Sequence, residues 1–325
     1  MIVQYCSHEE ARKHGKDRYG NQRFRCKLCG KTFVEEATKP LGNMQIERKT
    51  AEIALQLIVE GSSIRTVERV TGLHRNTICR LVALVGNRCE YLMRRWIHNI
   101  PAKHVEMDET WGYVFCKQKT SNRLGHGEDT GDAYTFIAID RDTKLVLAYH
   151  VGKRDGNSTA AMVWKLSRAV FGQFQLTTDG FGPYRRWVYR FLKDRTSFAQ
   201  LTKIYGVDRR SGAVARSSES RYSPAEIIDV QRDSRWGTPD RNMVSTSFVE
   251  RFNLTIRMTN RRMTRLTNGF SKTWQNHEAA MALCLAHYNF CKIHGTIGTT
   301  PATEAGLTDK PWKIPRLLDE CATQL

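Results

Sequence analysis

The sequence contains no apolar run of about 18 residues, which excludes a transmembrane helix of ordinary length and predicts no membrane partner. Its first ten residues lack the basic and then apolar layout of a secretory signal, so we expect a cytoplasmic protein. Its nine cysteines are odd in number and form no paired framework. That absence excludes a disulfide-bonded scaffold and is consistent with a reducing compartment.

Acidic residues are scarce relative to basic ones. The chain has 33 Asp and Glu against 51 Lys and Arg, which gives a formal net charge of +18. Such an excess attracts a polyanion through the release of counterions, so nucleic acid is the leading partner. Charge alone would also suit a ribosomal or membrane-surface protein. With 325 residues, 40% of them hydrophobic, the chain can bury one large core plus one or two small modules.

Residues 1–40 have the pattern of a small zinc-binding module. Cys26 and Cys29 are separated by two residues and followed by a glycine, as a zinc knuckle requires. A zinc ribbon would carry another cysteine three residues before Cys6, where this chain has Val3. A metal-free remnant held by its aromatic residues is therefore the alternative. The candidate Zn²⁺ ligands are Cys6, Cys26, Cys29 and His8, with His14 as a second choice for the fourth position.

Residues 45–100 have a helical pattern typical of a helix-turn-helix. Ser62 and Ser63 can cap a short helix that ends at Gly72, and the next helix begins near His74. In a helix-turn-helix the second helix enters a DNA groove. A plain helical hairpin is the alternative, but the basic outer face favours DNA binding. The candidate DNA contacts of this helix are His74, Arg75, Asn76 and Arg80.

Residues 101–310 alternate strand and helix patterns. Three strands, a helix, a strand and a helix follow one another, which is the order of the ribonuclease H-like fold. We therefore expect an α/β domain with a mixed sheet and flanking helices, in which the first and fourth strands are adjacent at the centre. That arrangement would bring Asp108 and Asp179 opposite each other. Residues 311–325 form a short amphipathic tail.

Carboxylates placed in this way can hold divalent metal. Two cations roughly 4 Å apart activate a water or a 3'-hydroxyl and stabilise the leaving oxygen in phosphodiester chemistry, and Mg²⁺ prefers hard oxygen ligands. Asp108 and Asp179 end or interrupt apolar strand patterns, and Glu250 opens a helical pattern. Aspartates also occur commonly in turns, so the residues alone leave both interpretations open.

Three segments carry a family resemblance. Glu106–Val114, Leu176–Gly180 and Ser245–Met258 resemble the three acidic motifs of bacterial DDE transposases, most closely the family of insertion sequence one. The similarity covers nearly the whole chain. It implies Mg²⁺-dependent (or Mn²⁺-dependent) cleavage of DNA at the ends of a mobile element and joining of the 3'-hydroxyls to target DNA. It also implies binding to terminal inverted repeats by a homodimer or larger assembly.

The resemblance assigns the three catalytic and metal-binding acids as Asp108, Asp179 and Glu250. Strand alternation places Glu106 and Asp108 on one face of the strand and Glu109 on the other, so the spacing by itself permits more than one set of metal-binding acids. The family match favours Asp108 and makes Glu109 the less suitable ligand.

The segment Arg251–His277 contains no Asp or Glu. A solvated structural helix usually mixes charges of both signs, so a stretch of one sign favours phosphate contact. The family also carries a basic residue seven positions after the glutamate, which is Arg257 here. The candidate DNA contacts of this segment are Asn253, Arg257, Arg261, Arg262 and Arg265.

The interval between Asp179 and Glu250 is long compared with related families. Residues 203–242 account for the extra length, and we expect them to be a functional or disordered loop. Glu219 and Glu226 are the rival candidates for the third acid. The competing functions are a non-catalytic DNA-binding regulator with a decayed catalytic domain and a nuclease that lacks strand transfer.

Overall fold

The computed structural model describes residues 10–17, 22–34, 39–205 and 227–323, which fall into two compact units, 1–40 and 41–325. The first unit contains a three-stranded antiparallel sheet of β1 (Ala11–Lys16), β2 (Gln22–Cys26) and β3 (Thr32–Val34). Gly30 has a left-handed backbone (φ 73°) after Cys29, and Phe24 stacks on Phe33 at 6.0 Å. The other proposed zinc ligands, Cys6 and His8, lie outside the described residues.

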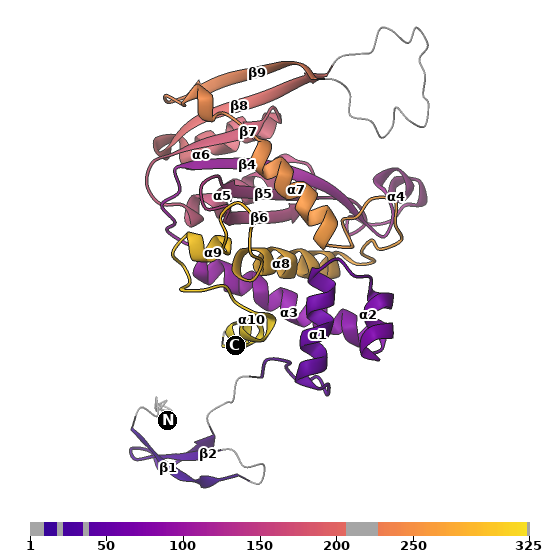
Figure 1. Cartoon of the computed structure of the whole chain (residues 1–325), viewed down its shortest axis with the longest axis vertical. Helices are drawn as coiled ribbons and strands as arrows, with labels where there is room; N and C mark the ends of the chain where they lie inside the picture. The colour runs from indigo at the N-terminus through magenta and orange to yellow at the C-terminus, as the bar shows by residue number, and fades with distance from the viewer. Residues whose placement is uncertain (1–9, 18–21, 35–38, 206–226, 324–325) are drawn as a thin grey trace, which may run out of the picture. The chain divides into compact units, whose positions relative to one another are not determined.

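The second unit is built on a six-stranded mixed sheet with the order β6-β5-β4-β7-β8-β9 (Figure 1). Its strands are β4 (His104–Val114), β5 (Gly131–Asp140), β6 (Val146–Gly152), β7 (Phe174–Asp179), β8 (Thr196–Tyr205) and β9 (Ile227–Trp236). β4 pairs in parallel with β7, and Met107 lies opposite Thr178. The predicted adjacency of the first and fourth strands is therefore confirmed, and the sheet is compatible with a ribonuclease H-like fold.

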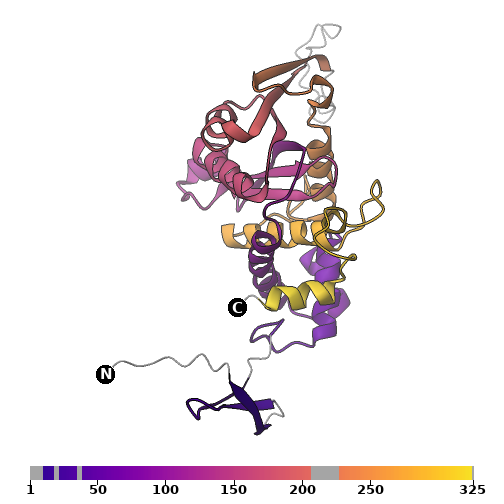
Figure 2. The ribbon, with the colours of Figure 1, turned by 90° about the vertical axis from the view of Figure 1, so that its left-hand side faces the viewer.

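Helices cover both faces of this sheet. α5 (Gly156–Ala169) and α6 (Gly182–Leu192) lie on one face, and α7 (Ser247–Thr259) crosses the other, as the two orthogonal views show (Figures 1 and 2). α8 (Trp274–Phe290) packs below the sheet and is buried along most of its length. Three shorter helices accompany the sheet: α4 (Gln118–Leu124), α9 (Pro301–Glu304) and α10 (Ile314–Ala322). Among the described residues, no helix combines the length and apolar character needed to cross a bilayer.

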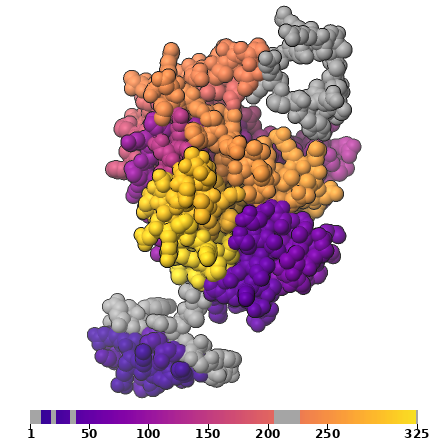
Figure 3. Space-filling view, viewed as in Figure 1, coloured from indigo at the N-terminus to yellow at the C-terminus, as the bar shows by residue number. Residues whose placement is uncertain are grey.

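Three helices precede the sheet: α1 (Arg48–Val59), α2 (Ile64–Thr71) and α3 (Arg75–Trp96). The Ser63 hydroxyl accepts a hydrogen bond from the backbone N–H of Thr66 at 3.1 Å, and Gly72 ends α2 in a left-handed conformation. Both predicted helix boundaries are confirmed. α3 continues for 22 residues, and its buried side chains share one apolar core with the sheet. α10, in the C-terminal segment, packs against α1 and α3 (Figure 3).

The stretch 203–242 differs from the expected loop. Residues 196–205 and 227–236 form the antiparallel pair β8 and β9, so most of the described residues in this stretch are strand. β9 was missed because six of its ten residues are exposed and four are charged, which leaves no clean apolar alternation. The rival acids Glu219 and Glu226 lie outside the described residues. The finer division into domains at 45–100, 101–310 and 311–325 stays a prediction.

The close approach of α3 and α8 at Gly86 generates a stability prediction. A Cβ at this position would lie 2.0 Å from the Ala279 carbonyl oxygen, so Gly86→Ala must push the two helices apart. We expect a loss of about 2 kcal/mol in the free energy of unfolding, because overpacking outweighs the gain in helix propensity. Urea unfolding of Gly86→Ala and of the unmodified protein measures this loss in the free energy of unfolding.

Gly156→Ala in α5 is the matched control. Its added Cβ would meet only the Trp187 indole nitrogen at 3.6 Å, an ordinary contact. We expect this variant to be as stable as the unmodified protein or slightly more stable. Equal unfolding midpoints for the two variants would show that the α3–α8 contact adapts without cost.

Candidate functional site

The candidate site lies where β7 ends beside β4. Asp108 lies one residue beyond the paired Met107, and Asp179 is the last residue of β7. Carboxylate oxygens of Asp108, Glu109 and Asp179 all lie within 4.8 Å of one another. Three oxygen donors at this separation can share a divalent cation. The structure thus brings together two of the three predicted acids and adds Glu109 to them.

The two aspartates are partly buried and repel one another. Burial, followed by the charges of Glu109 and Asp179, raises the pKa of Asp108 to about 7. Burial and the charge of Glu109 raise the pKa of Asp179 to about 6, although Asp179 accepts a hydrogen bond from the Phe181 N–H at 3.0 Å. The amide of Asn253 on α7 donates to Asp108 at 2.9 Å. Carboxylates with this repulsion gain stability when a cation binds between them.

Glu109 enters the cluster from the opposite face of β4. Its carboxylate accepts a hydrogen bond from the buried Tyr184 hydroxyl of α6 at 2.8 Å and pairs with Arg154. Arg154 also lies 3.5 Å from Asp179. The pairing of β4 with β7 ends at Met107 and Thr178, whereas β4 continues beside β5. The edge of β4 on the β7 side is therefore not paired at Asp108 and Glu109, and side chains from both faces can meet there. Strand alternation alone could not reveal this, since it depends on where the partner strand stops.

Glu250 lies in the first turn of α7, beside the cluster. Its charge contributes to the raised pKa of both Asp108 and Asp179, but its carboxylate is outside the group of three within 4.8 Å. It pairs with Lys203 of β8 and accepts a hydrogen bond from the Thr246 hydroxyl at 2.8 Å. The role of Glu250 as third metal ligand therefore stays a prediction.

Glu106 has a structural position. Its carboxylate accepts hydrogen bonds from the backbone N–H groups of Phe248 and Val249, at 2.8 and 3.1 Å, at the start of α7. The residue before the helix, Thr246, makes no capping bond with its own side chain. Glu106, on β4, supplies the cap instead, which satisfies two backbone donors at the start of the helix and complements the helix dipole. Burial raises the pKa of Glu106.

The predicted DNA contacts occupy several different environments. Arg257 lies on the same side of α7 as Asn253 and donates to the Thr110 hydroxyl of β4 at 3.1 Å. Arg262 turns inward and donates to the Ser271 hydroxyl at 3.3 Å. The remaining candidates are exposed: Arg75, Asn76, Arg80, Arg261 and Arg265.

Comparisons with known proteins add little to this geometry. No protein-family model and no curated protein matches the chain. Among solved structures, the chain is similar to a piggyBac transposase in a cryo-EM synaptic complex with hairpin DNA. The similarity has a TM-score of 0.35 and 13% identity, and covers 82% of this chain and 69% of that one. At this level the likeness supports no argument, and the functional case depends on the residues of the site.

The raised pKa of Asp108 predicts a pH-dependent gain in stability for Asp108→Asn. The folded-state pKa of about 7 exceeds the ordinary 3.8, so stability from the protonated form is complete below 3.8 and is lost as the pH rises through 7. Without divalent cations, we expect Asp108→Asn to be more stable at pH 8 by about 2 kcal/mol. The full pKa difference would give roughly 4 kcal/mol, reduced here because the carboxyl is partly solvated.

Thermal unfolding across pH 4 to 8 measures this gain. The difference should vanish near pH 4, and added Mg²⁺ should stabilise the unmodified protein while leaving Asp108→Asn unchanged. Asp309→Asn, at an exposed position away from the cluster, is the control. A pH-independent difference would contradict electrostatic repulsion as the cause.

The cap at α7 predicts different outcomes for two substitutions of Glu106. Glu106→Ala leaves two backbone donors without an acceptor and should cost about 2 kcal/mol in the free energy of unfolding. Glu106→Gln keeps an acceptor oxygen and should recover most of that loss. Hydrogen exchange of the Phe248 and Val249 amides, together with urea unfolding, measures the effect. Equal losses for both variants would assign the stabilisation to charge rather than to hydrogen bonding.

Proposed function

We propose that this protein is a DNA transposase that binds the terminal inverted repeats of a mobile element, cleaves DNA at its ends and joins the 3'-hydroxyls to target DNA. The observation that carries this proposal is the acidic cluster of Asp108, Glu109 and Asp179 within 4.8 Å at the centre of a mixed sheet. The strongly basic composition and the three acidic sequence motifs support DNA as the substrate.

The donor set fits a hard divalent cation, Mg²⁺ or Mn²⁺. All candidate ligands are carboxylate oxygens. Burial, followed by the charges of neighbouring acids, raises the pKa of both aspartates, and a bound cation would lower it again. When bound, a pair of such cations activates the attacking hydroxyl or water and stabilises the leaving oxygen. Asp108 and Asp179 are the ligands that geometry and motif both support.

Glu250 and Glu109 are both placed to complete the site. Each is paired with a basic side chain in this structure, Lys203 and Arg154 respectively. A dication beside the aspartates would compete with these basic groups for the carboxylates. We assign Glu250 as the third ligand because of its motif, and Glu109 as the acid that keeps Arg154 beside Asp179.

DNA contacts follow from the surrounding residues. Arg257, on the side of α7 that faces Thr110, is proposed to contact DNA near the cleaved bond. The helix-turn-helix and the zinc-ribbon-like module, with Zn²⁺ on Cys6, Cys26, Cys29 and His8, are proposed to recognise the terminal repeats. Because two element ends react together, the active form is proposed to be a homodimer or a larger DNA-bound assembly.

The test uses labelled element ends incubated with Mg²⁺. Asp108→Asn, Asp179→Asn and Glu250→Gln should each lower the cleavage rate by at least about a hundredfold, because even residues that only support metal ligands cost 10–100-fold. Glu109→Gln should lower it less, since Glu109 acts through Arg154. Asp309→Asn should retain the full rate, and DNA affinity should be similar in all variants.

Other outcomes would identify the competing functions. DNA binding without any cleavage by the unmodified protein would favour the non-catalytic regulator. Cleavage without joining to target DNA would favour a nuclease. If Glu109→Gln abolished cleavage while Glu250→Gln did not, Glu109 would be the third ligand and the motif-based assignment would be wrong.

A further inference from the structure

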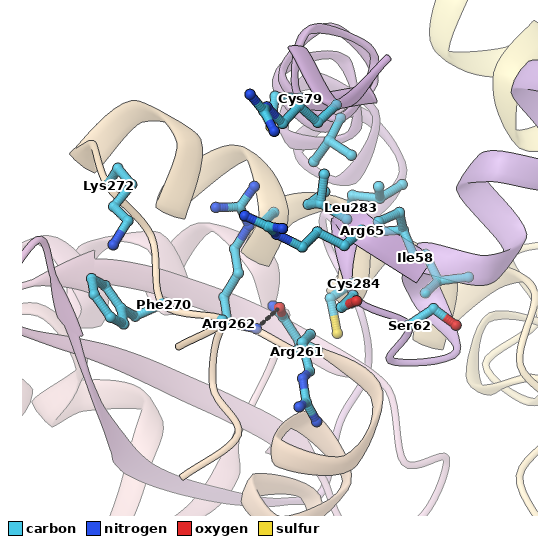
Figure 4. Close-up of a pocket in the computed structure, with 18 of the residues that line it drawn as sticks. Ile58, Ser62, Arg65, Cys79, Arg261, Arg262, Phe270, Lys272, Leu283 and Cys284 are labelled. Atoms are coloured by element: carbon cyan, nitrogen blue, oxygen red, sulfur yellow. Dashed lines mark hydrogen bonds between the residues drawn. The ribbon is translucent and has the colours of Figure 1, made fainter. Parts of the chain in front are cut away.

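A second candidate site lies away from the acidic cluster, in a cavity of about 470 Å³ in the second unit (Figure 4). Its walls come from the end of α1, the start of α2, the first turns of α3, the α7–α8 connection and the middle of α8. Among the residues that the structure describes, no acidic residue lines it, whereas five basic residues do: Arg65, Arg75, Arg261, Arg262 and Lys272. A cavity with charges of one sign should attract an anion.

Arg262 is the strongest single indication of a missing anionic ligand. Its guanidinium contacts the Ser271 hydroxyl at 3.3 Å and the Cys79 thiol, and burial lowers its pKa. Within the described part of the chain, no carboxylate pairs with Arg262. A partly buried cation without an opposite charge is costly. Arg65 and Arg262 both reach into the cavity, whereas Arg261 points away from it (Figure 4).

The cavity also has an extensive apolar wall, which a site for phosphate alone would not need. Apolar side chains come from four helices, α1, α2, α3 and α8, and from the connection between α7 and α8: Ile58, Val59, Ile64, Val82, Phe270 and Leu283. Asn76 and Asn268 add amide groups that can donate to and accept from a base edge. Its volume is in the range of pockets that enclose a small molecule, about 300–1,000 Å³. A DNA duplex is far too wide to enter.

We propose that this cavity binds one unpaired nucleotide of a DNA strand. The base lies against the apolar wall, and its phosphates contact Arg65 and Arg262. Arg75 and Asn76 line the cavity and also begin α3, so a duplex held by α3 would have its end close to the opening. The inference rests on the proposed function only in taking DNA as the ligand, and it requires neither metal nor catalysis.

The test compares two DNA probes by fluorescence anisotropy in EDTA with the full-length protein. One probe is a fully paired duplex, and the other is the same duplex with a short single-stranded extension. The unmodified protein should prefer the extended probe. Arg65→Gln and Phe270→Leu should each reduce that preference about tenfold, through loss of a charged phosphate contact and of apolar contact with the base.

Arg69→Gln is the matched control. Arg69 is exposed on the same helix as Arg65, one turn further along, and does not line the cavity. It should leave the preference for the extended probe unchanged, even if it weakens binding to both probes. Equal effects of Arg65→Gln and Arg69→Gln would overturn the proposal, because they would show a general electrostatic surface. Circular dichroism confirms that each variant is folded.

Further outcomes separate the possible ligands. A free deoxynucleoside monophosphate could displace the extended probe when it is present at the same concentration as that probe. This result would identify a site for free nucleotides and would overturn the proposal that the cavity binds a nucleotide of a DNA strand. Arg65→Gln could instead change the oligomeric state, measured by light scattering, while the preference for the extended probe is retained. This result would identify an acidic protein segment as the ligand of the cavity. A retained preference in a protein that cleaves no DNA would contradict the proposed function while supporting the cavity.

Discussion

The hydrogen bonds between Glu106 and the start of α7 determine how the candidate site is assembled. Glu106 lies two residues before Asp108 on β4, and α7 carries Glu250 and Asn253. By accepting from the N–H groups of Phe248 and Val249, one carboxylate fixes the end of the helix to the strand that holds the first aspartate. Residues far apart in the chain are therefore held in a common frame before any cation binds. Preorganisation of this kind is what a metal site needs from its scaffold.

The electrostatics of the site follow from that frame. Four acids are held close together, and the protein offsets their repulsion with two basic side chains, Arg154 and Lys203. Burial, followed by the charges of the neighbouring acids, keeps the pKa of both aspartates raised despite these partners, so the compensation is incomplete. The remaining repulsion is the physical reason that a divalent cation would bind here more favourably than at an exposed acidic cluster.

Local sequence patterns were sufficient for features that depend on neighbouring residues. Alternation and helical periodicity predicted the order of strands and helices along the chain, the cap at Ser63 and the turn at Gly72. The pairing that brings Asp108 near Asp179 was predicted because that order matches the ribonuclease H-like fold. Features that depend on distant partners were not predictable in this way. The place of Glu109 in the cluster depends on the end of β7, and the capping role of Glu106 depends on a helix 142 residues away.

The inward position of Arg262 is another feature that depends on distant partners and that local sequence patterns could not predict. The charged residues of the segment Arg251–His277 are all basic, and on that pattern Arg262 was predicted to contact DNA together with Arg261 and Arg265. The turn after α7 instead directs Arg262 against Ser271, while Arg261 and Arg265 remain exposed. A charge pattern reports composition along the chain, but the direction of each side chain depends on packing against α3 and α8.

The contact between α3 and α8 joins the helix proposed to bind DNA to the scaffold of the acidic cluster. Gly86 allows the backbones of the two helices to meet, and the buried residues of α3 belong to the same core as β4 and β7. The helix that begins with Arg75 is therefore packed directly on the scaffold that holds Asp108, without a flexible linker between them. If α3 reads a terminal repeat, the distance from the recognised sequence to the acids is set by helix packing. The position of the cut relative to the repeat would then be a property of the fold itself.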